Sequence, residues 1–226
     1  MSDSPSVSSY VPDPAAETEM LIDAFFRALS ERFSEEPALA GRLRDRHQRL
    51  VGEQQGRVVD EPSRYNLAMT LAVLGAYQEL GTGHADEELI PALRAAFVEP
   101  LEPFVREATR SVLDRAEDPF AAMVALTRDR EAQAFGAGFE FVHPEDDPER
   151  FTSQVERCFY HDVLRANGAE KLTPVFCAFD ANWIDAIDPD RDGFEFERPT
   201  TIGTGGSRCP FRFRRTPGAL RAERTG

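Results

Sequence analysis

Residues 193–215 read GFEFERPTTIGTGGSRCPFRFRR, and this stretch decides the fold class. At its two ends, residues 193–198 and 209–215, aromatic and charged residues alternate, which is typical of strands with one buried and one exposed face. The glycine-rich residues 203–206 between them suit a hairpin. The stretch therefore predicts two neighbouring antiparallel strands near the C-terminus.

The segment before these strands has the same phenylalanine-rich texture. Residues 135–143 alternate as a third strand, with Phe139 and Phe141 on one face. Two helices are expected between the strands, one over residues 151–167 that ends at Gly168 and one over residues 172–187 that begins near Pro174. The acidic residues 188–193 resemble the start of a calcium-binding loop, but position 12 of that loop would be Pro199, so we interpret them as an acidic loop.

The first part of the chain has a helical pattern instead. Apolar residues recur at spacings of three and four, which predicts helices near residues 20–33, 36–50, 62–80, 86–116 and from 118 onward. Prolines at 91, 100 and 103 should bend or interrupt the helix over 86–116. The predicted class is α+β: a helical N-terminal half packed on a small antiparallel β-sheet, with two further helices in the C-terminal half.

These patterns also divide the chain. Residues 1–14 are rich in Ser and Pro and are expected to form a disordered lead-in. Residues 15–216 are expected to form a single α+β domain, with a helical part at 15–133 and a cysteine-containing α/β part at 134–216. Residues 217–226 are expected to form a flexible tail. No pattern typical of a catalytic site occurs in the helical part, which we interpret as a scaffold or lid.

The charge of the chain limits its partners. Lys and Arg total 26 against 40 Asp and Glu, a net charge of −14, which excludes general binding to nucleic acid or to an anionic membrane surface. Residues 198–226 carry seven arginines and one acid, so a small carboxylate-bearing partner remains possible there. There is no signal-like N-terminus or bilayer-length apolar run, and the three cysteines are odd in number. We therefore expect a cytoplasmic protein with reduced thiols, and possible homo-oligomers.

The three cysteines are predicted to converge. On a helical projection, Cys158 faces inward on the same stripe as Asp162. Cys177 and Asp180 are three residues apart and share a face of the next helix. Cys209 has the parity of the buried face of the last strand. Three separate elements would then direct thiols toward one interior site.

Several uses of such a site remain open. A thiolate nucleophile needs a nearby base or positive charge, and the candidate bases are His143, His161, Asp162 and Asp180. A zinc or iron site could instead use all three cysteines with His161. Their spacings of 19 and 32 residues lack the close pairs typical of zinc sites, so no cofactor is expected. Buried cysteines can also serve packing alone.

The C-terminal half resembles a known family in four motifs. They are Cys158, LTPVFCAFD at residues 172–180, FERPTTIG at 196–203 and CPFRF at 209–213; NLAMTLAVLGAY at 66–77 is also similar. In these motifs the chain resembles the L-2-amino-thiazoline-4-carboxylic acid hydrolase family. The positions that match are Cys158, Cys177, Asp180, Gly203 and Cys209. The namesake reaction adds water to a thiazoline ring carbon and yields N-carbamoyl-L-cysteine.

The resemblance implies a small-molecule hydrolase that opens or cleaves a cyclic amidine- or amide-type C–N bond in a carboxylate-bearing substrate, in a specialised metabolic pathway. The expected catalytic residues are Cys177, Asp180, Cys209 and Cys158, and the expected substrate-binding residues are Arg198, Arg208, Gly203 and His161. Attack by a thiolate and attack by metal-activated water both remain open. The alternatives are a non-catalytic, cysteine-lined ligand- or metal-binding module that acts as carrier or sensor, and a structural protein with inert thiols.

Overall fold

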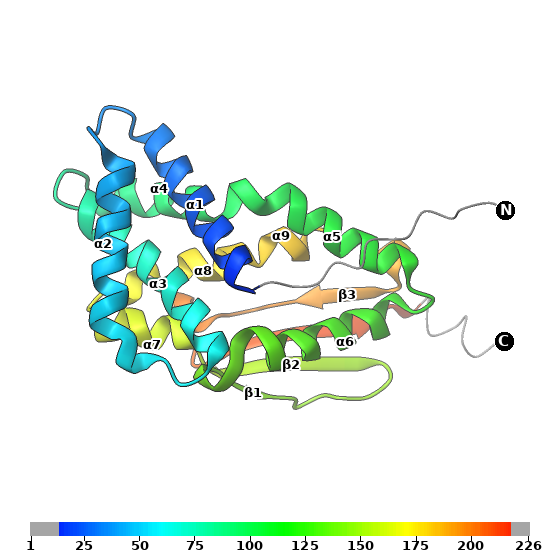
Figure 1. Cartoon of the computed structure of the whole chain (residues 1–226). Helices are drawn as coiled ribbons and strands as arrows, with labels where there is room; N and C mark the ends of the chain where they lie inside the picture. The colour runs from blue at the N-terminus through cyan, green and yellow to red at the C-terminus, as the bar shows by residue number, and fades with distance from the viewer. Residues whose placement is uncertain (1–13, 218–226) are drawn as a thin grey trace, which may run out of the picture.

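The computed structural model describes residues 14–217 (Figure 1). Its elements in chain order are α1 (Pro14–Arg32), α2 (Leu39–Gln54), η1 (Gln55–Arg57), α3 (Glu61–Leu80), α4 (Asp86–Val98), η2 (Glu99–Leu101), α5 (Glu102–Arg115), α6 (Pro119–Arg130), η3 (Glu131–Phe135), η4 (Gly136–Gly138), β1 (Glu140–Val142), β2 (Arg150–Arg157), α7 (Phe159–Ala166), η5 (Glu170–Leu172), α8 (Thr173–Phe179), α9 (Ala181–Ile184), α10 (Pro189–Asp192), β3 (Phe194–Glu197), η6 (Ile202–Thr204) and β4 (Cys209–Arg215). Apart from Pro14 and Pro217, the expected lead-in 1–14 and tail 217–226 lie outside the described residues.

The α+β class is confirmed. The four strands form one antiparallel sheet in the order β1-β2-β4-β3, and helices make up the N-terminal half (Figure 1). The predicted antiparallel pairing of residues 194–197 with the last strand is also confirmed, with Phe196 opposite Phe213. None of the helices within residues 14–217 has both the length and the apolar character that a bilayer crossing requires.

Local sequence explains where the N-terminal helices begin and end. Asp60 caps α3, because its carboxylate accepts the N–H of Ser63 while the Ser63 hydroxyl accepts the N–H of Asp60. The predicted interruption of the helix over 86–116 is confirmed: α4 ends at Val98, a short 3-10 turn follows, and α5 starts with Pro103 in its first turn. Pro91, in contrast, lies inside α4.

The predicted helix over residues 151–167 is wrong. Residues 150–157 form the strand β2, and only Phe159–Ala166 is helical. The apolar residues Phe151 and Val155 are spaced for a helix and also for a strand, because residues four apart share a face in both. Pairing settles the choice, since β2 lies between β1 and β4 and hydrogen-bonds to both. Cys158 therefore stands at the junction of strand and helix, and not on a helical stripe.

Three smaller predictions also need correction. Only Glu140–Val142 of residues 135–143 is a strand, because a π-helical turn, Glu131–Phe135, and a 3-10 turn precede it. The glycine-rich residues 203–206 do not form a plain hairpin turn: Ile202–Thr204 is a 3-10 helix, and Gly205 has a φ of +93° just after it. The acidic residues 188–193 contain the short helix α10, which Asp188 caps.

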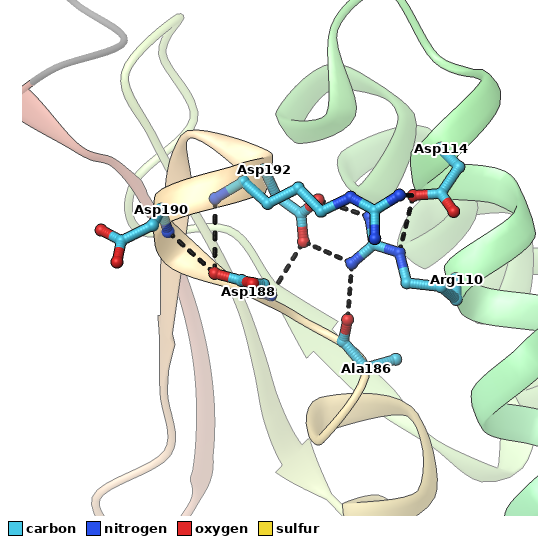
Figure 2. Close-up of polar contacts among 7 residues, drawn as sticks. Arg110, Asp114, Ala186, Asp188, Asp190 and Asp192 are labelled. Atoms are coloured by element: carbon cyan, nitrogen blue, oxygen red, sulfur yellow. Dashed lines mark hydrogen bonds and ion pairs between the residues drawn. The ribbon is translucent and has the colours of Figure 1, made fainter.

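Residue Asp192 of that helix is buried and binds α5 (Figure 2). The Arg110 guanidinium donates to both carboxylate oxygens of Asp192, at 2.8 and 2.5 Å, to the carbonyl of Ala186 at 2.7 Å and to Asp114 at 2.8 Å. The Asp192 Oδ2 also accepts the backbone N–H of Asp188 at 2.8 Å. This network attaches the segment before β3 to α5, and the interpretation of residues 188–193 as an acidic loop did not include it.

Two hydrophobic clusters fill the interior. The larger joins α1–α4 to α7 and α8 and reaches the sheet at Val155 and Cys209. The smaller lies between α5, α6 and the strands β2, β3 and β4, with Phe151, Phe194 and Phe213 at its centre. Phe211 packs against both clusters and is itself only partly buried. The seam between the clusters is therefore centred on Phe211.

Candidate functional site

The structure brings the three thiols together from three elements. Cys158 precedes α7, Cys177 lies in α8, and Cys209 is the first residue of β4. The Cys177 Sγ lies against Gly203 and the Cys209 Sγ accepts the N–H of Ile202, so both thiols meet η6. Charge on either of them would raise the pKa of Cys158. The predicted convergence is thus present, although Cys158 directly follows the strand β2 and does not lie on a helix.

Hydrogen-bond donors surround the Cys177 thiol. Burial raises its pKa, while the Thr201 hydroxyl, the charge of Arg198 and the N–H of Gly203 lower it, and the nearby charge of Asp180 raises it further. Gly203 is in direct contact: a Cβ at this position would lie 2.8 Å from the Cys177 Sγ. The sulfur therefore sits against a glycine backbone whose N–H would stabilise negative charge.

The other two thiols are also shielded from water. Burial raises the pKa of Cys158 to about 12, although the N–H groups of His161 and Tyr160 at the start of α7 oppose the rise. Burial raises the pKa of Cys209 to about 11, and its Sγ accepts the Ile202 N–H at 3.1 Å. All three cysteines are therefore neutral thiols at pH 7.

Asp180 and Arg198 form an ion pair beside Cys177. The Arg198 Nη1 donates to the Asp180 Oδ2, and the Arg198 Nη2 donates to the Cys177 carbonyl at 2.9 Å. The Trp183 Nε1 donates to the Asp180 Oδ1 at 3.2 Å. Burial raises the pKa of Asp180, and the charge of Arg198 opposes that rise. Arg198, predicted to hold a substrate carboxylate, thus already holds a carboxylate of the protein.

These groups lie where the two hydrophobic clusters meet, and we call this partly exposed position the recess. Burial is the largest cause of the raised pKa of both Asp180 and Tyr160. Nevertheless 27% of the Asp180 side chain is accessible to solvent. Asp180 is therefore shielded by protein atoms and still open to solvent on one side. Phe179, Trp183 and Phe211 are likewise only partly buried where they pack on the clusters.

The remaining predicted residues lie at different distances from the recess. His161 contacts the Thr173 hydroxyl at 3.1 Å, and Thr173 in turn lies beside Gly203. Arg208 is exposed, and no described residue forms an ion pair or a hydrogen bond with its side chain. The expectation that Asp162 faces inward is wrong, because it pairs with Arg165 at the surface, 3.3 Å away.

Sequence reasoning missed the contribution of the helical half. The Tyr160 hydroxyl donates to the Asn66 Oδ1 at 2.9 Å, and the Asn66 Nδ2 donates to the Ala134 carbonyl at 3.0 Å. Arg130, at the end of α6, lowers the pKa of both Tyr160 and Asp180 by its positive charge. The signal that was available is Asn66 itself, a polar residue on the mostly apolar buried face of α3.

The geometry favours acid–base and nucleophilic chemistry. A neutral thiol with donors around its sulfur lies one helical turn before a carboxylate that is paired with a guanidinium. Within residues 14–217, no three His, Cys, Asp or Glu side chains are arranged to hold a metal ion.

Comparisons with known proteins agree with this description. A family model described as L-2-amino-thiazoline-4-carboxylic acid hydrolase matches residues 65–213, which is well over half of the chain and runs from α3 to β4. The comparison with curated proteins gave no match, and neither did the comparison with solved structures. The match includes all three cysteines, Asp180 and Gly203. The chain belongs to the L-2-amino-thiazoline-4-carboxylic acid hydrolase family.

Proposed function

We propose that this protein hydrolyses a small cyclic amidine that carries a carboxylate, with Cys177 as the nucleophile. The observation that carries the proposal is the setting of Cys177, whose sulfur lies against the Gly203 N–H and the Thr201 hydroxyl and close to Asp180. Such donors stabilise negative charge on sulfur during attack, although the resting thiol is neutral. The family name supports the same reaction class.

The first half of the reaction forms a covalent adduct. The Cys177 S–H proton passes to the Asp180 carboxylate as the sulfur bonds to the amidinium carbon of the substrate. The tetrahedral adduct then collapses, the bond from this carbon to the ring heteroatom breaks, and the leaving atom takes the proton from Asp180. The product of this step is an open-chain amidine joined to the sulfur of Cys177.

The second half returns the free enzyme. Water adds to the same carbon and gives a proton to Asp180, the carbon–sulfur bond to Cys177 breaks, and Cys177 takes the proton back. For a 2-amino-thiazoline ring, the product keeps both nitrogens on the former ring carbon. The ring bond that breaks is therefore carbon–sulfur, whereas a ring with a nitrogen leaving group would lose its C–N bond.

Positive charge around the recess would hold the substrate carboxylate. Arg198 uses one N–H on Asp180 and one on Cys177, so its other N–H groups remain available to a ligand. Arg130 adds a second charge close to Asp180. Arg208 lies on the exposed segment before β4 and would act at the mouth of the recess. The proposed reaction needs no metal or cofactor.

Turnover of L-2-amino-thiazoline-4-carboxylate tests the proposal. Purified protein is incubated with this compound, and released thiol and N-carbamoyl-L-cysteine are measured by thiol titration and mass spectrometry. A ring-opened substrate adduct on the peptide that contains Cys177, found after rapid acid quenching, is the expected intermediate. Asp162→Asn, a surface carboxylate variant, is the matched control for Asp180→Asn, which should lose at least 100-fold in kcat.

A cysteine-lined binding module would behave differently in the same assay. It would bind cyclic amidines without releasing thiol, and Cys177→Ala would change affinity but no rate. Absence of turnover for this compound and for a panel of five- and six-membered cyclic amidines, together with measurable binding, would overturn the hydrolase proposal.

A further inference from the structure

A single row of side chains crosses the helix-covered face of the sheet beneath the recess. Val142 pairs with Gln154, so the next residue of the β1 segment, His143, lies beside Ser153. Ser153 pairs with Phe211 on β4. Glu197 pairs with Arg212, so Arg198, just past β3, comes beside Phe211. The Arg198 guanidinium indeed lies 5.1 Å from the centre of the Phe211 ring.

Each end of this row is bound by a carboxylate. Asp180 binds Arg198 at one end, as described above. At the other end, the Glu131 Oε1 accepts the hydroxyl of Ser153, and the Glu131 Oε2 lies 2.9 Å from the His143 Nε2. The partly buried Phe211 lies between the carboxylates of Glu131 and Asp180 in this row.

The spacing of the row suits a small ring. Neighbouring strands are about 4.8 Å apart, so Ser153 on β2 and the Arg198 position beside β4 are separated by about 10 Å. A flat five-membered ring with a hydrogen-bonding group at each end would span this distance. Glu131 opens the π-helical turn that follows α6, and such turns often occur at functional sites.

The two carboxylates differ in what they can still bind. Asp180 is neutralised by the guanidinium of Arg198. Glu131 is held by a hydroxyl and an imidazole and uses one lone pair on each oxygen, so each oxygen can accept one more N–H. An amidinium offers two parallel N–H groups, which match a carboxylate as a guanidinium does. The side chain of Glu131 is 12% exposed, so solvent still reaches it.

We propose that Glu131 binds the amidinium end of the substrate, with Ser153 and His143 as positioning residues that orient its carboxylate. This inference rests on the proposed function, because it assigns the second wall of the same recess. It places the cationic end of the substrate over β2 and leaves the carboxylate end toward Arg198. The ring carbon then lies over Phe211, between the two walls.

Trp183, the single tryptophan of the chain, gives a binding signal that does not depend on turnover. Its ring packs at 6.2 Å from Phe211, so a ligand on Phe211 changes its fluorescence. The probes are 2-amino-2-thiazoline, a cationic amidine without a carboxylate, and thiazole, a neutral ring of similar size. Glu131→Gln is compared with Glu140→Gln, an exposed glutamate on β1.

The expected result is that Glu131→Gln weakens binding of 2-amino-2-thiazoline at least tenfold and leaves the affinity for thiazole within twofold of wild type. Ser153→Ala, which keeps the charge of Glu131, should weaken binding of the amidine by a smaller factor. Glu140→Gln should bind both probes like wild type. Thermal melting of each variant shows whether it is folded at the assay temperature.

Two results would overturn this inference: binding of the amidine that is unchanged in Glu131→Gln, or failure of the wild-type protein to bind it. Failure of the proposed function looks different, because then the amidine binds through Glu131 but no cyclic amidine is opened. If turnover depends on Cys177 and Glu131→Gln leaves KM unchanged, the hydrolase proposal stands and this inference alone is wrong.

Discussion

A Cβ atom at position 203 would lie 2.8 Å from the Sγ of Cys177, so glycine is the residue that allows η6 to approach α8 this closely. The same Cβ would lie 3.0 Å from the Thr173 Cγ2 and 3.1 Å from the backbone nitrogen of Pro174. The side chain of Cys177 can rotate away, but the backbone of α8 cannot move without repacking. The position of the Cys177 thiol therefore depends on the absence of a side chain at residue 203 of η6.

Gly203→Ala is expected to lower kcat/KM at least tenfold, because the added methyl group displaces the Cys177 sulfur from the Gly203 and Thr201 donors. The cost in stability is about 1–3 kcal/mol, as for overpacked sites. Steady-state kinetics and urea unfolding measure the two effects. Gly52→Ala in α2, where a Cβ meets nothing within 4 Å, is the matched control and should leave both unchanged or slightly raise stability.

Removal of the guanidinium from the Asp180–Arg198 pair is expected to destabilise the protein. Only 15% of Arg198 and 27% of Asp180 are exposed, so Arg198→Met leaves a shielded charge without a partner and costs about 3 kcal/mol. The double variant with Asp180→Asn should recover most of that loss in a double-mutant cycle. Equal losses in the single and double variants would show that the pair does not stabilise the fold.

The shielded thiols predict a loss of stability in alkali. In the folded protein the pKa of Cys158 is about 12 and that of Cys209 about 11, both above the ordinary value of 9.0. The folded state therefore holds more protons than the unfolded state above about pH 9, and stability falls as pH rises. Each thiol contributes about 1.4 kcal/mol per pH unit in that range.

Urea unfolding at pH 8, 9 and 10 measures this slope, and Cys158→Ala should reduce it. A slope that is the same in the variant and in wild type would contradict the burial of Cys158. Alkylation by iodoacetamide is a second readout: the Cys177 peptide should react first, because the Thr201 hydroxyl, the charge of Arg198 and the Gly203 N–H lower the pKa of its thiol.

The Arg110–Asp192 network predicts a stability effect remote from the recess (Figure 2). Burial would raise the pKa of Asp192, but the hydrogen bonds from Arg110 and from the Asp188 N–H bring it below its ordinary value. The stability from this group is therefore present above about pH 4 and is lost as pH falls further. Arg110→Met should cost about 3–5 kcal/mol at pH 7, since Asp192 is only 4% exposed.

Asp190→Asn is a matched control, because Asp190 is exposed and only its backbone N–H contacts the carboxylate of Asp188. It should leave the midpoint of thermal unfolding unchanged. At a temperature where Arg110→Met is folded, its kcat should equal that of wild type. A large loss of kcat there would mean that this network also shapes the recess.

Periodicity predicted the helical half and the pairing of β3 with β4, because these segments have one dominant spacing of apolar residues. It failed over residues 151–167, where Phe151 and Val155 fit a helix and a strand equally. Only pairing with β1 and β4, which lie outside that window, separates the two. Local pattern carries no information on partners that are distant in sequence.

The residues of the candidate site also differ in whether a local sequence pattern could predict them. The inward direction of Cys177 and Cys209 follows from the pattern of their own elements, and the structure brings both to one recess. The sequence did not show that Asp180 pairs with Arg198, which was expected to bind the substrate instead. Glu131 had no sequence signal, because its role depends on a π-helical turn and on a strand register that no local window shows.

The rate of ring opening by Cys177→Ala, measured beside Cys158→Ala under the same conditions, tests the central claim most directly. Both variants remove a shielded thiol from the same recess, so their structural costs are similar. A fall of at least 1,000-fold in kcat/KM for Cys177→Ala, with Cys158→Ala within tenfold of wild type, is the expected result. Turnover by Cys177→Ala within tenfold of wild type would contradict a covalent role for this residue.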